Sequence, residues 1–161
     1  MTEEEHKSGR KNATEKTALV TAVDYLARQA HSEKKLREKL QRKGFPQEDI
    51  DAAIERLIER KYLDDADLCA QQFMYLYNES RYSVRQIFVK LMQRGFDKEL
   101  IRSAVPPDMA EREAAAAERV LAMKFKPTDK KQKMMANLYQ KGFSVDTAHA
   151  AVRNFTEGAE A

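Results

Sequence analysis

Apolar residues recur along this chain at steps of three and four positions, with polar residues between them. Three such sets follow one another in the first part of the chain: Leu19, Val23, Leu26 and Ala30; Leu36 and Leu40; Ile50, Ile54, Leu57 and Ile58. This spacing is typical of amphipathic helices that bury one stripe. Sustained two-residue alternation, the pattern of a half-buried strand, is absent. The pattern therefore predicts an all-α protein.

The same order of three helical patterns returns twice. The second set is Ala66, Cys69, Phe73 and Leu76; Ile87 and Leu91; Leu100, Ile101 and Val105. The third is Ala117, Val120 and Leu121; Met134 and Leu138; Val145, Ala148, Val152 and Phe155. A self-similar period of tens of residues is typical of repeat architectures. We predict an elongated tandem array of three three-helix repeats, about nine helices in all, whose units share cores with their neighbours.

A triplet of a basic residue, Gly and Phe marks the same point in each repeat. The three triplets are Lys43-Gly44-Phe45, Arg94-Gly95-Phe96 and Lys141-Gly142-Phe143, with spacings of 51 and 47 residues. Each follows the second helical pattern of its repeat. Glycine commonly ends a helix in a left-handed conformation, and the residue after it folds back onto the helix. The preceding cation lies beside the negative end of the helix dipole. We therefore predict a positive φ at each glycine.

Start signals precede the second helix of each repeat. Ser32 and Ser83 stand 51 residues apart and are predicted N-caps. Ser83 with Gln86 fits a capping box, and Asp129 with Gln132 is a weaker analogue. From these signals we expect repeats over residues 14–62, 63–107 and 108–156, with disordered tails at 1–13 and 157–161.

Composition narrows the class of protein. The chain has 161 residues and a single cysteine, Cys69, which lies on an apolar helical face and is expected to be a buried small residue. No apolar run approaches the ~20 residues that span a bilayer, and no signal-peptide pattern is present. We expect a cytoplasmic protein, monomeric and without a membrane partner.

Charge is distributed unevenly, although the net charge is only +3. Seven basic and two acidic residues lie between Arg28 and Lys43, six and two between Arg81 and Arg102, and six and one between Lys124 and Lys141. We placed all three blocks on the second helix of a repeat, where together they favour a polyanion or an acidic protein face. The candidate contact residues are Arg81, Arg85, Lys90, Arg94, Lys34, Lys35, Arg37, Lys39, Lys124, Lys126, Lys130 and Lys131. Ordinary solvated faces are the alternative, since 34% of the chain is charged.

No group of residues forms a catalytic or metal-binding motif. His6, His31 and His149 are far apart in the sequence, and no phosphate loop or nucleophile motif occurs. The acidic run Asp64-Asp65-Ala66-Asp67 lacks the glycine and distal glutamate of a calcium loop, so helix capping is the better interpretation. We therefore expect neither an enzyme nor a cofactor.

Several of these segments together resemble the RecX regulatory proteins of bacteria. The resemblance rests on His31-Ser32, Leu36-Arg37, Leu40, Lys43-Gly44-Phe45, Tyr62-Leu63-Asp64-Asp65-Ala66, Arg81-Tyr82-Ser83, Arg85, Ile87, Leu91 and Arg94-Gly95-Phe96, and covers roughly residues 17–155. Two features depart from the family: Ser83-Val84 stands where Gly-Pro is common, and Leu68 where Phe or Tyr is common. Neither departure undermines the tandem three-helix fold that the resemblance implies.

The resemblance also implies a function. RecX proteins bind the RecA recombinase filament on DNA, suppress its ATP hydrolysis and strand exchange, and affect filament growth or disassembly. An extended helical repeat suits such a filament, because stacked repeats make long curved surfaces. Two alternatives remain at this point: a sequence-nonspecific nucleic-acid-binding repeat protein, on single- or double-stranded DNA, with no obligatory RecA partner, and a helical scaffold for another protein.

Overall fold

The computed structural model describes residues 16–158, which are helical and contain no strand. The helices are α1 (Ala18–Arg28), α2 (Glu33–Arg42), α3 (Gln47–Glu59), α4 (Asp65–Glu79), α5 (Val84–Gln93), α6 (Lys98–Ala104), α7 (Ala110–Lys124), α8 (Lys131–Gln140) and α9 (Val145–Glu157). The all-α prediction is confirmed. The tail expected at 1–13 lies outside the described residues, and so does most of the tail expected at 157–161.

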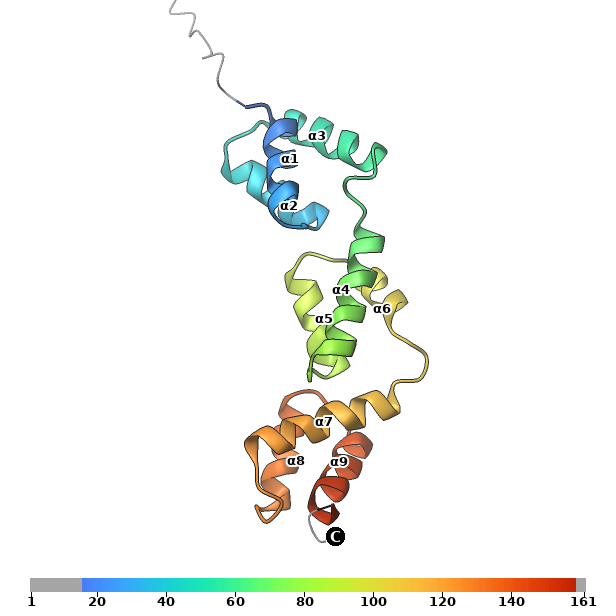
Figure 1. The fold of residues 1–161 in the computed structure, drawn as a ribbon. Coiled ribbons are helices and arrows are strands. Elements are labelled where there is room, and N and C mark those ends of the chain that lie inside the picture. The colour runs from blue at the N-terminus through green and yellow to red at the C-terminus, as the bar shows by residue number, and fades with distance from the viewer. Residues whose placement is uncertain (1–15, 159–161) are drawn as a thin grey trace, which may run out of the picture.

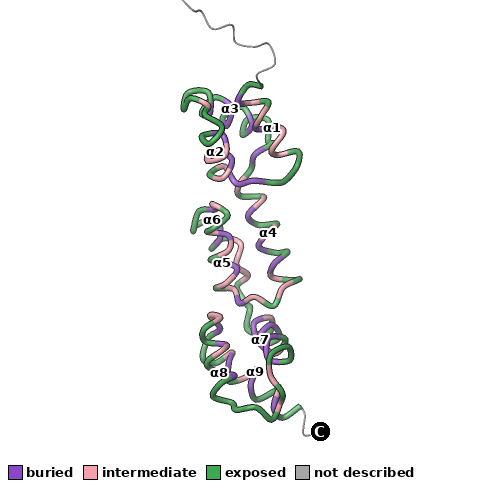
Figure 2. Tube along the Cα trace, turned by 90° about the vertical axis from the view of Figure 1, so that its left-hand side faces the viewer, coloured by how far each residue is buried: buried purple, intermediate pink, exposed green. Residues whose placement is uncertain are grey.

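The nine helices of the described range form three units of three, stacked along the axis of an elongated molecule (Figure 1). Each unit buries apolar side chains between its own helices, and Figure 2 shows buried residues within all three units. The buried centres are Leu36, Leu40 and Ile54 in the first unit, Phe73, Ile87 and Leu91 in the second, and Leu121, Met134 and Leu138 in the third. The elongated tandem array of three-helix repeats is therefore confirmed.

The cores of neighbouring units are separate, so our expectation of shared cores was wrong. Three buried clusters form, and none of them includes a residue from the helices of another unit. The middle helices of successive units meet end to end rather than face to face (Figures 1 and 2). Helix ends carry unpaired N–H and C=O groups, so the junctions between units are polar and are held by hydrogen bonds.

The three glycine triplets close the middle helices in one way. Gly44, Gly95 and Gly142 have φ of 89°, 93° and 90°, which confirms the predicted left-handed conformation. The Phe45 N–H donates to the Leu40 carbonyl at 3.3 Å, and the Gly44 N–H to the Gln41 carbonyl at 2.9 Å. The same two hydrogen bonds recur at the other two triplets. This pair of bonds is the Schellman motif, which satisfies carbonyls that the helix end leaves free.

Most of the predicted N-caps are confirmed. Ser32 and Ser83 cap α2 and α5, Ser83 forms the capping box with Gln86, and Asp64 caps α4. The analogue in the third repeat was wrong: α8 begins after Lys130, which makes no side-chain cap hydrogen bond. The Asp129 carboxylate instead accepts the Lys126 N–H at 2.7 Å, within the loop before the helix.

The buried stripe of α1 also differs from the predicted one. Ala18 and Ala22 are buried, whereas Val23 is 46% exposed. Ala30 lies beyond the end of α1 at Arg28 and is exposed. Small residues line the buried stripe of α1 in the first unit, so the bulkier Leu19 and Leu26 flank the contact and are only half-buried. Counting apolar residues by size alone missed this stripe.

The junction glycines are expected to tolerate substitution less well than the glycine at the end of the array. A Cβ at Gly95 would lie 2.6 Å from Ser32 Oγ and 3.1 Å from Lys34 Cβ, whereas a Cβ at Gly44 would meet nothing within 4 Å. Gly44→Ala adds only the left-handed strain, about 1 kcal/mol. Gly95→Ala adds a collision with a hydrogen-bonded side chain, so we expect about 2–3 kcal/mol. Urea unfolding of both variants measures the difference, and equal losses would contradict the crowding at this junction.

Candidate functional site

The middle helices α2, α5 and α8 form a head-to-tail stack, the helix column. Ser32 Oγ donates to the carbonyl of Arg94, the C-cap of α5, at 2.5 Å and accepts the Lys35 N–H at 3.2 Å. At the next junction, Ser83 Oγ donates to the Lys141 carbonyl at 2.6 Å and accepts the Gln86 N–H at 3.1 Å. A hydroxyl donates and accepts at once, so it joins the start of one helix to the end of the next.

A carboxylate from the following unit completes each junction. Asp65 Oδ1 accepts the Glu33 N–H at 2.9 Å, and Glu113 Oε1 accepts the Val84 N–H at 3.1 Å. Both acceptors lie at a helix N-terminus, where backbone N–H groups and the dipole favour negative charge. Burial raises the pKa of Asp65 above its usual value, although the hydrogen bond from Glu33 opposes this shift. These contacts set the orientation of each unit on the next.

The first junction gathers three of the sequence-predicted cations around a hollow. Lys35 and Lys39 of α2 and Arg94 of α5 line this hollow of about 280 Å³, beside Gln72. The guanidinium of Arg94 donates to Gln72 Oε1 at 2.9 Å, and the ammonium of Lys39 lies 5.1 Å from the centre of the Tyr25 ring. Lys34 lies next to the same junction, with its Cβ close to Gly95.

Lys34 and Lys39 have counterparts at the second junction. Arg85 stands 51 residues after Lys34, and its stem packs 3.0 Å from where a Cβ of Gly142 would lie. Lys90 stands 51 residues after Lys39, with its ammonium 4.5 Å from the centre of the Tyr82 ring. Arg81 is exposed and precedes α5. The repeat therefore places cations at equivalent positions of α2 and α5.

Arg37 does not contribute a free charge to this surface. Its guanidinium donates to Asp51 Oδ1 at 2.6 Å and to Glu33 Oε1 at 3.4 Å. The hydrogen bond that Arg37 donates to Asp51 raises the pKa of Arg37, and burial only partly opposes this. Arg37 thus pairs with acidic groups of its own unit, as Lys35 does with Glu38 Oε2 at 3.3 Å, whereas Lys34, Lys39 and Arg94 make no ion pair within 4.0 Å in the described range.

The third group of cations lies at the far end of the column rather than along α8. Lys124 is the last residue of α7, Lys126 lies in the connecting loop, Lys130 precedes α8, and only Lys131 belongs to α8. Our placement of this block on the second helix of the repeat was therefore wrong for most of its members. Counted back from Gly142, α8 fills the same positions that α2 and α5 fill before Gly44 and Gly95, so Lys124 and Lys126 precede the second helix of the repeat.

Sequence reasoning missed the residue that makes most of the hydrogen bonds at the second junction. Arg112 of α7 donates to the carbonyls of Tyr77 at 2.8 Å and Tyr82 at 2.5 Å, and pairs with Glu113 at 2.6 Å. It also reaches the carbonyls of Leu76 and Ser80, and lies over the Tyr77 ring. Its carbonyl partners are 30 or more residues earlier in the chain, so no local pattern reveals it.

The surroundings of His31 predict that the first junction is sensitive to pH. Its Nδ1 donates to the Gln29 carbonyl at 2.6 Å, and its ring is buried beside Tyr25 and the hollow lined by Lys35 and Lys39. Burial lowers the pKa of His31 below its usual 6.5, and Lys39 adds to this, although the Gln29 hydrogen bond opposes it. The unfolded chain therefore binds a proton before the folded chain does, as the pH falls below 6.5.

We expect stability to fall as the pH drops through this range. Urea unfolding at about pH 7.5 and about pH 5.5 should show a lower free energy of unfolding at the lower pH. His31→Gln should flatten that dependence, because it removes the titrating ring. His149→Gln, at an exposed position of α9, is the matched control and should keep it. A His31→Gln variant with the full pH dependence would place its origin in other groups.

Among residues 16–158, every helix is too short or too polar to cross a membrane. No group of three His, Cys, Asp or Glu side chains in residues 16–158 has the geometry of a metal site. Cys69 is fully buried, as predicted, and burial raises the pKa of its thiol, which keeps it in the neutral form.

Comparison with known proteins identifies the family. The model of the first three-helix domain of RecX matches residues 18–57, which span α1, α2 and most of α3. The regulatory protein RecX of Chlorobaculum tepidum is 32% identical over 142 residues, covering 85% of this chain and 87% of that protein. The RecX of Caldanaerobacter subterraneus is 30% identical, covering 85% and 70%.

Other relatives are longer, and the fold is shared with a solved structure. The match to the RecX of Bacillus licheniformis, at 31% identity, covers 86% of this chain but 55% of that protein. The crystal structure of RecX from Lactobacillus salivarius superimposes with a TM-score of 0.75, covering 86% of this chain and 94% of that one, at 20% identity. The chain therefore belongs to the RecX family of regulatory proteins.

Proposed function

We propose that this chain binds the RecA recombinase filament on DNA and inhibits its ATP hydrolysis and strand exchange, without catalysing a reaction itself. Membership of a family of regulatory proteins supports a regulatory role. The elongated array of repeats supports a long contact that spans adjacent subunits of a filament (Figure 1). Binding across subunits would block the rearrangement that hydrolysis and exchange require.

The recurrence of free cations along the helix column is the observation that carries the proposal. Six of the candidate residues on or beside α2 and α5 make no ion pair within 4.0 Å in the described part of the chain: Lys34, Lys39, Arg81, Arg85, Lys90 and Arg94. Lys34 and Arg85 occupy equivalent places at the two junctions, and so do Lys39 and Lys90. Several unpaired charges along an extended surface attract an acidic protein face or phosphates over a long contact.

A titration of RecA-dependent ATP hydrolysis on single-stranded DNA tests the proposal. We expect the hydrolysis rate to fall as the protein is added, and to fall at protein concentrations that leave naked DNA unbound. Steady hydrolysis at saturating protein would overturn the proposal.

The same cations support a second candidate, a nucleic-acid-binding repeat protein that needs no RecA. Binding to naked single-stranded DNA that weakens steeply with salt would favour it, because each phosphate contact adds about 0.7 to the slope of log affinity against log salt concentration. Inhibition that occurs only where the protein saturates the DNA would assign the effect to competition for DNA.

A further inference from the structure

The helix column is open at the C-terminus of α2, which we call the open end. In the other two units, a serine hydroxyl from the preceding unit donates to the carbonyl of the C-cap, at Arg94 and Lys141. No hydrogen bond to the carbonyl of Lys43, the C-cap of α2, forms among residues 16–158. Among the described residues, none covers in the first unit the surface that its two copies bury.

Burial of the triplets shows the same difference. Phe96 and Phe143 are each 3% exposed, whereas Phe45 is only half-buried. Gly44 is open, with nothing within 4 Å of where its Cβ would lie, although Gly95 and Gly142 are closely covered. The open end thus combines a half-buried aromatic ring with a helix C-terminus that no described residue caps.

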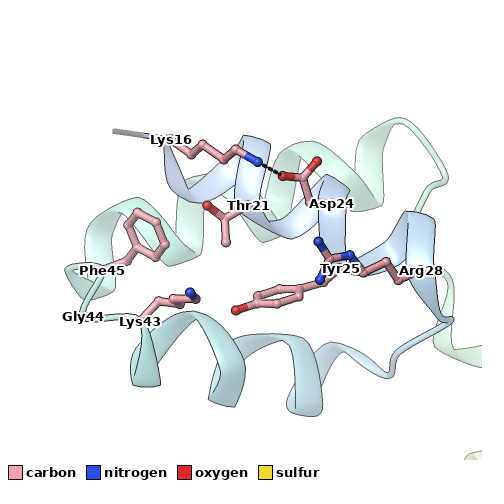
Figure 3. A pocket seen from close by; sticks show the side chains of 8 residues that line it. All are labelled: Lys16, Thr21, Asp24, Tyr25, Arg28, Lys43, Gly44 and Phe45. Atoms are coloured by element: carbon pink, nitrogen blue, oxygen red, sulfur yellow. Dashed lines mark hydrogen bonds and ion pairs between the residues drawn. The ribbon is translucent and has the colours of Figure 1, made fainter. Parts of the chain in front are cut away.

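A hollow of about 580 Å³ lies at this end (Figure 3). Its lining includes Thr21, Lys43 and Phe45. Residues 51 positions later, Gln72, Arg94 and Phe96, line the hollow of the first junction, which the start of α2 covers. The hollow at the open end is therefore the counterpart of an occupied junction, and it continues the interface that joins the units.

The charges of the hollow favour an acidic occupant. Lys16 and Asp24 are paired at 2.6 Å, and Lys16 lowers the pKa of that carboxyl (Figure 3). Arg28 and Lys43 make no ion pair within 4.0 Å in the described range. Acidic residues are favoured in the first turn of a helix, next to its positive dipole end.

A second copy of this chain does not fit the hollow. The opposite end of the column is the start of α8, where Lys130 stands 12 residues before Gly142, as Ser32 and Ser83 stand before Gly44 and Gly95. Lys130 makes no cap hydrogen bond, and Lys131 follows it. End-to-end docking of two copies would place these cations against Lys43 and Arg28.

We infer that the open end of α2 is a docking site for the N-terminus of a helix in another protein, led by Ser or Thr and with acidic residues in its first turn. The hydroxyl of the cap donates to the Lys43 carbonyl, the acidic side chains meet Arg28 and Lys43, and an apolar side chain covers Phe45. This docking extends the helix column by one helix from outside the chain. The inference is independent of RecA being the partner.

A helical peptide tests the inference on the full ¹⁵N-labelled chain. The probe is a side-chain-stapled peptide of about 15 residues that begins acetyl-Ser-Glu-Asp-Gln, long enough to hold a helix. We expect saturable chemical-shift changes at the amides of Thr21, Gly44 and Phe45. The control peptide begins with Asp: aspartate caps a helix as well as serine and adds a negative charge, but it cannot donate. It should bind at least about fivefold more weakly, through loss of the donated hydrogen bond.

Variants of the chain check the charges. Arg28→Glu with Lys43→Glu should abolish the shifts, whereas Arg119→Glu with Arg153→Glu, exposed residues of α7 and α9 with the same change in net charge, should leave them.

Equal or tighter binding of the Asp peptide, shifts confined to the junction cations, or no shifts would each overturn the inference. Concentration-dependent shifts of Gly44 without peptide would assign the site to a second copy. Through-space contacts from residues 1–15 to Phe45 would assign it to the chain itself. Either result would overturn the inference that the occupant is a helix of another protein.

Discussion

Arg112→Met is expected to lower the free energy of unfolding by about 3–5 kcal/mol, the usual cost of removing one partner of a buried ion pair. The Arg112 and Glu113 side chains are 15% and 10% exposed. Methionine keeps most of the stem but leaves the carbonyls of Tyr77, Tyr82 and Ser80 without their donor. It also leaves the Glu113 carboxylate buried without its cation.

The loss should appear as uncoupling of the third unit from the second. Each unit has its own core, so α7, α8 and α9 retain their internal packing when the junction fails. Urea unfolding followed by circular dichroism should then broaden or split into two steps. Arg119→Met is the matched control, because it makes the same substitution at an exposed position of the same helix. It should change stability by less than about 0.5 kcal/mol.

A double substitution separates the buried charge from the lost hydrogen bonds. Glu113→Gln retains an oxygen for the Val84 N–H, which Glu113 accepts at 3.1 Å, and removes the negative charge. In the Arg112→Met background it should therefore recover part of the loss, giving a coupling free energy of about 1–3 kcal/mol. Additive effects of the two substitutions, or equal stability of Arg112→Met and Arg119→Met, would show that this pair does not hold the junction.

The features predicted from the sequence are those that depend on neighbouring residues. The helix end at Gly95 follows from the steric freedom of glycine, and the capping box of Ser83 with Gln86 from groups three positions apart. The glycine signal occurs once in each of the three repeats, which strengthened the prediction. For this reason the helices and their order were predictable. The buried stripe of α1 and the N-cap of α8 were nevertheless assigned to the wrong residues.

The junctions were not predictable because their partners are far apart in the chain. Ser32 and the carbonyl of Arg94 are separated by 62 positions, and Ser83 and the carbonyl of Lys141 by 58. The serine pattern is fully explained by capping its own helix, so nothing in the sequence signals its second hydrogen bond. The candidate site shares this limit: sequence reasoning selected Arg37 and Arg94 alike, and only the structure shows that Arg37 is paired with Asp51.

Arg81→Glu with Arg85→Glu is expected to abolish most inhibition of RecA-dependent ATP hydrolysis while leaving the fold nearly intact. Both residues are exposed and make no ion pair within 4.0 Å in the described chain, so the melting temperature should hardly change. Glutamate keeps a Cβ and Cγ to pack near Gly142, where the stem of Arg85 lies. The protein concentration for half-inhibition should rise at least about tenfold, because two attractive charges become repulsive.

The position of the charges, rather than their sum, decides this result. Arg119→Glu with Arg153→Glu changes the net charge equally on α7 and α9 and should inhibit like wild type at matched salt. If both double variants lose inhibition alike, long-range attraction alone accounts for binding and the helix column is not the contact. If neither loses it, the contact moves to the first junction, where Lys34, Lys35 and Lys39 are the next residues to reverse. Arg37 is excluded from that set, because reversing it would break its pair with Asp51 and confuse stability with binding.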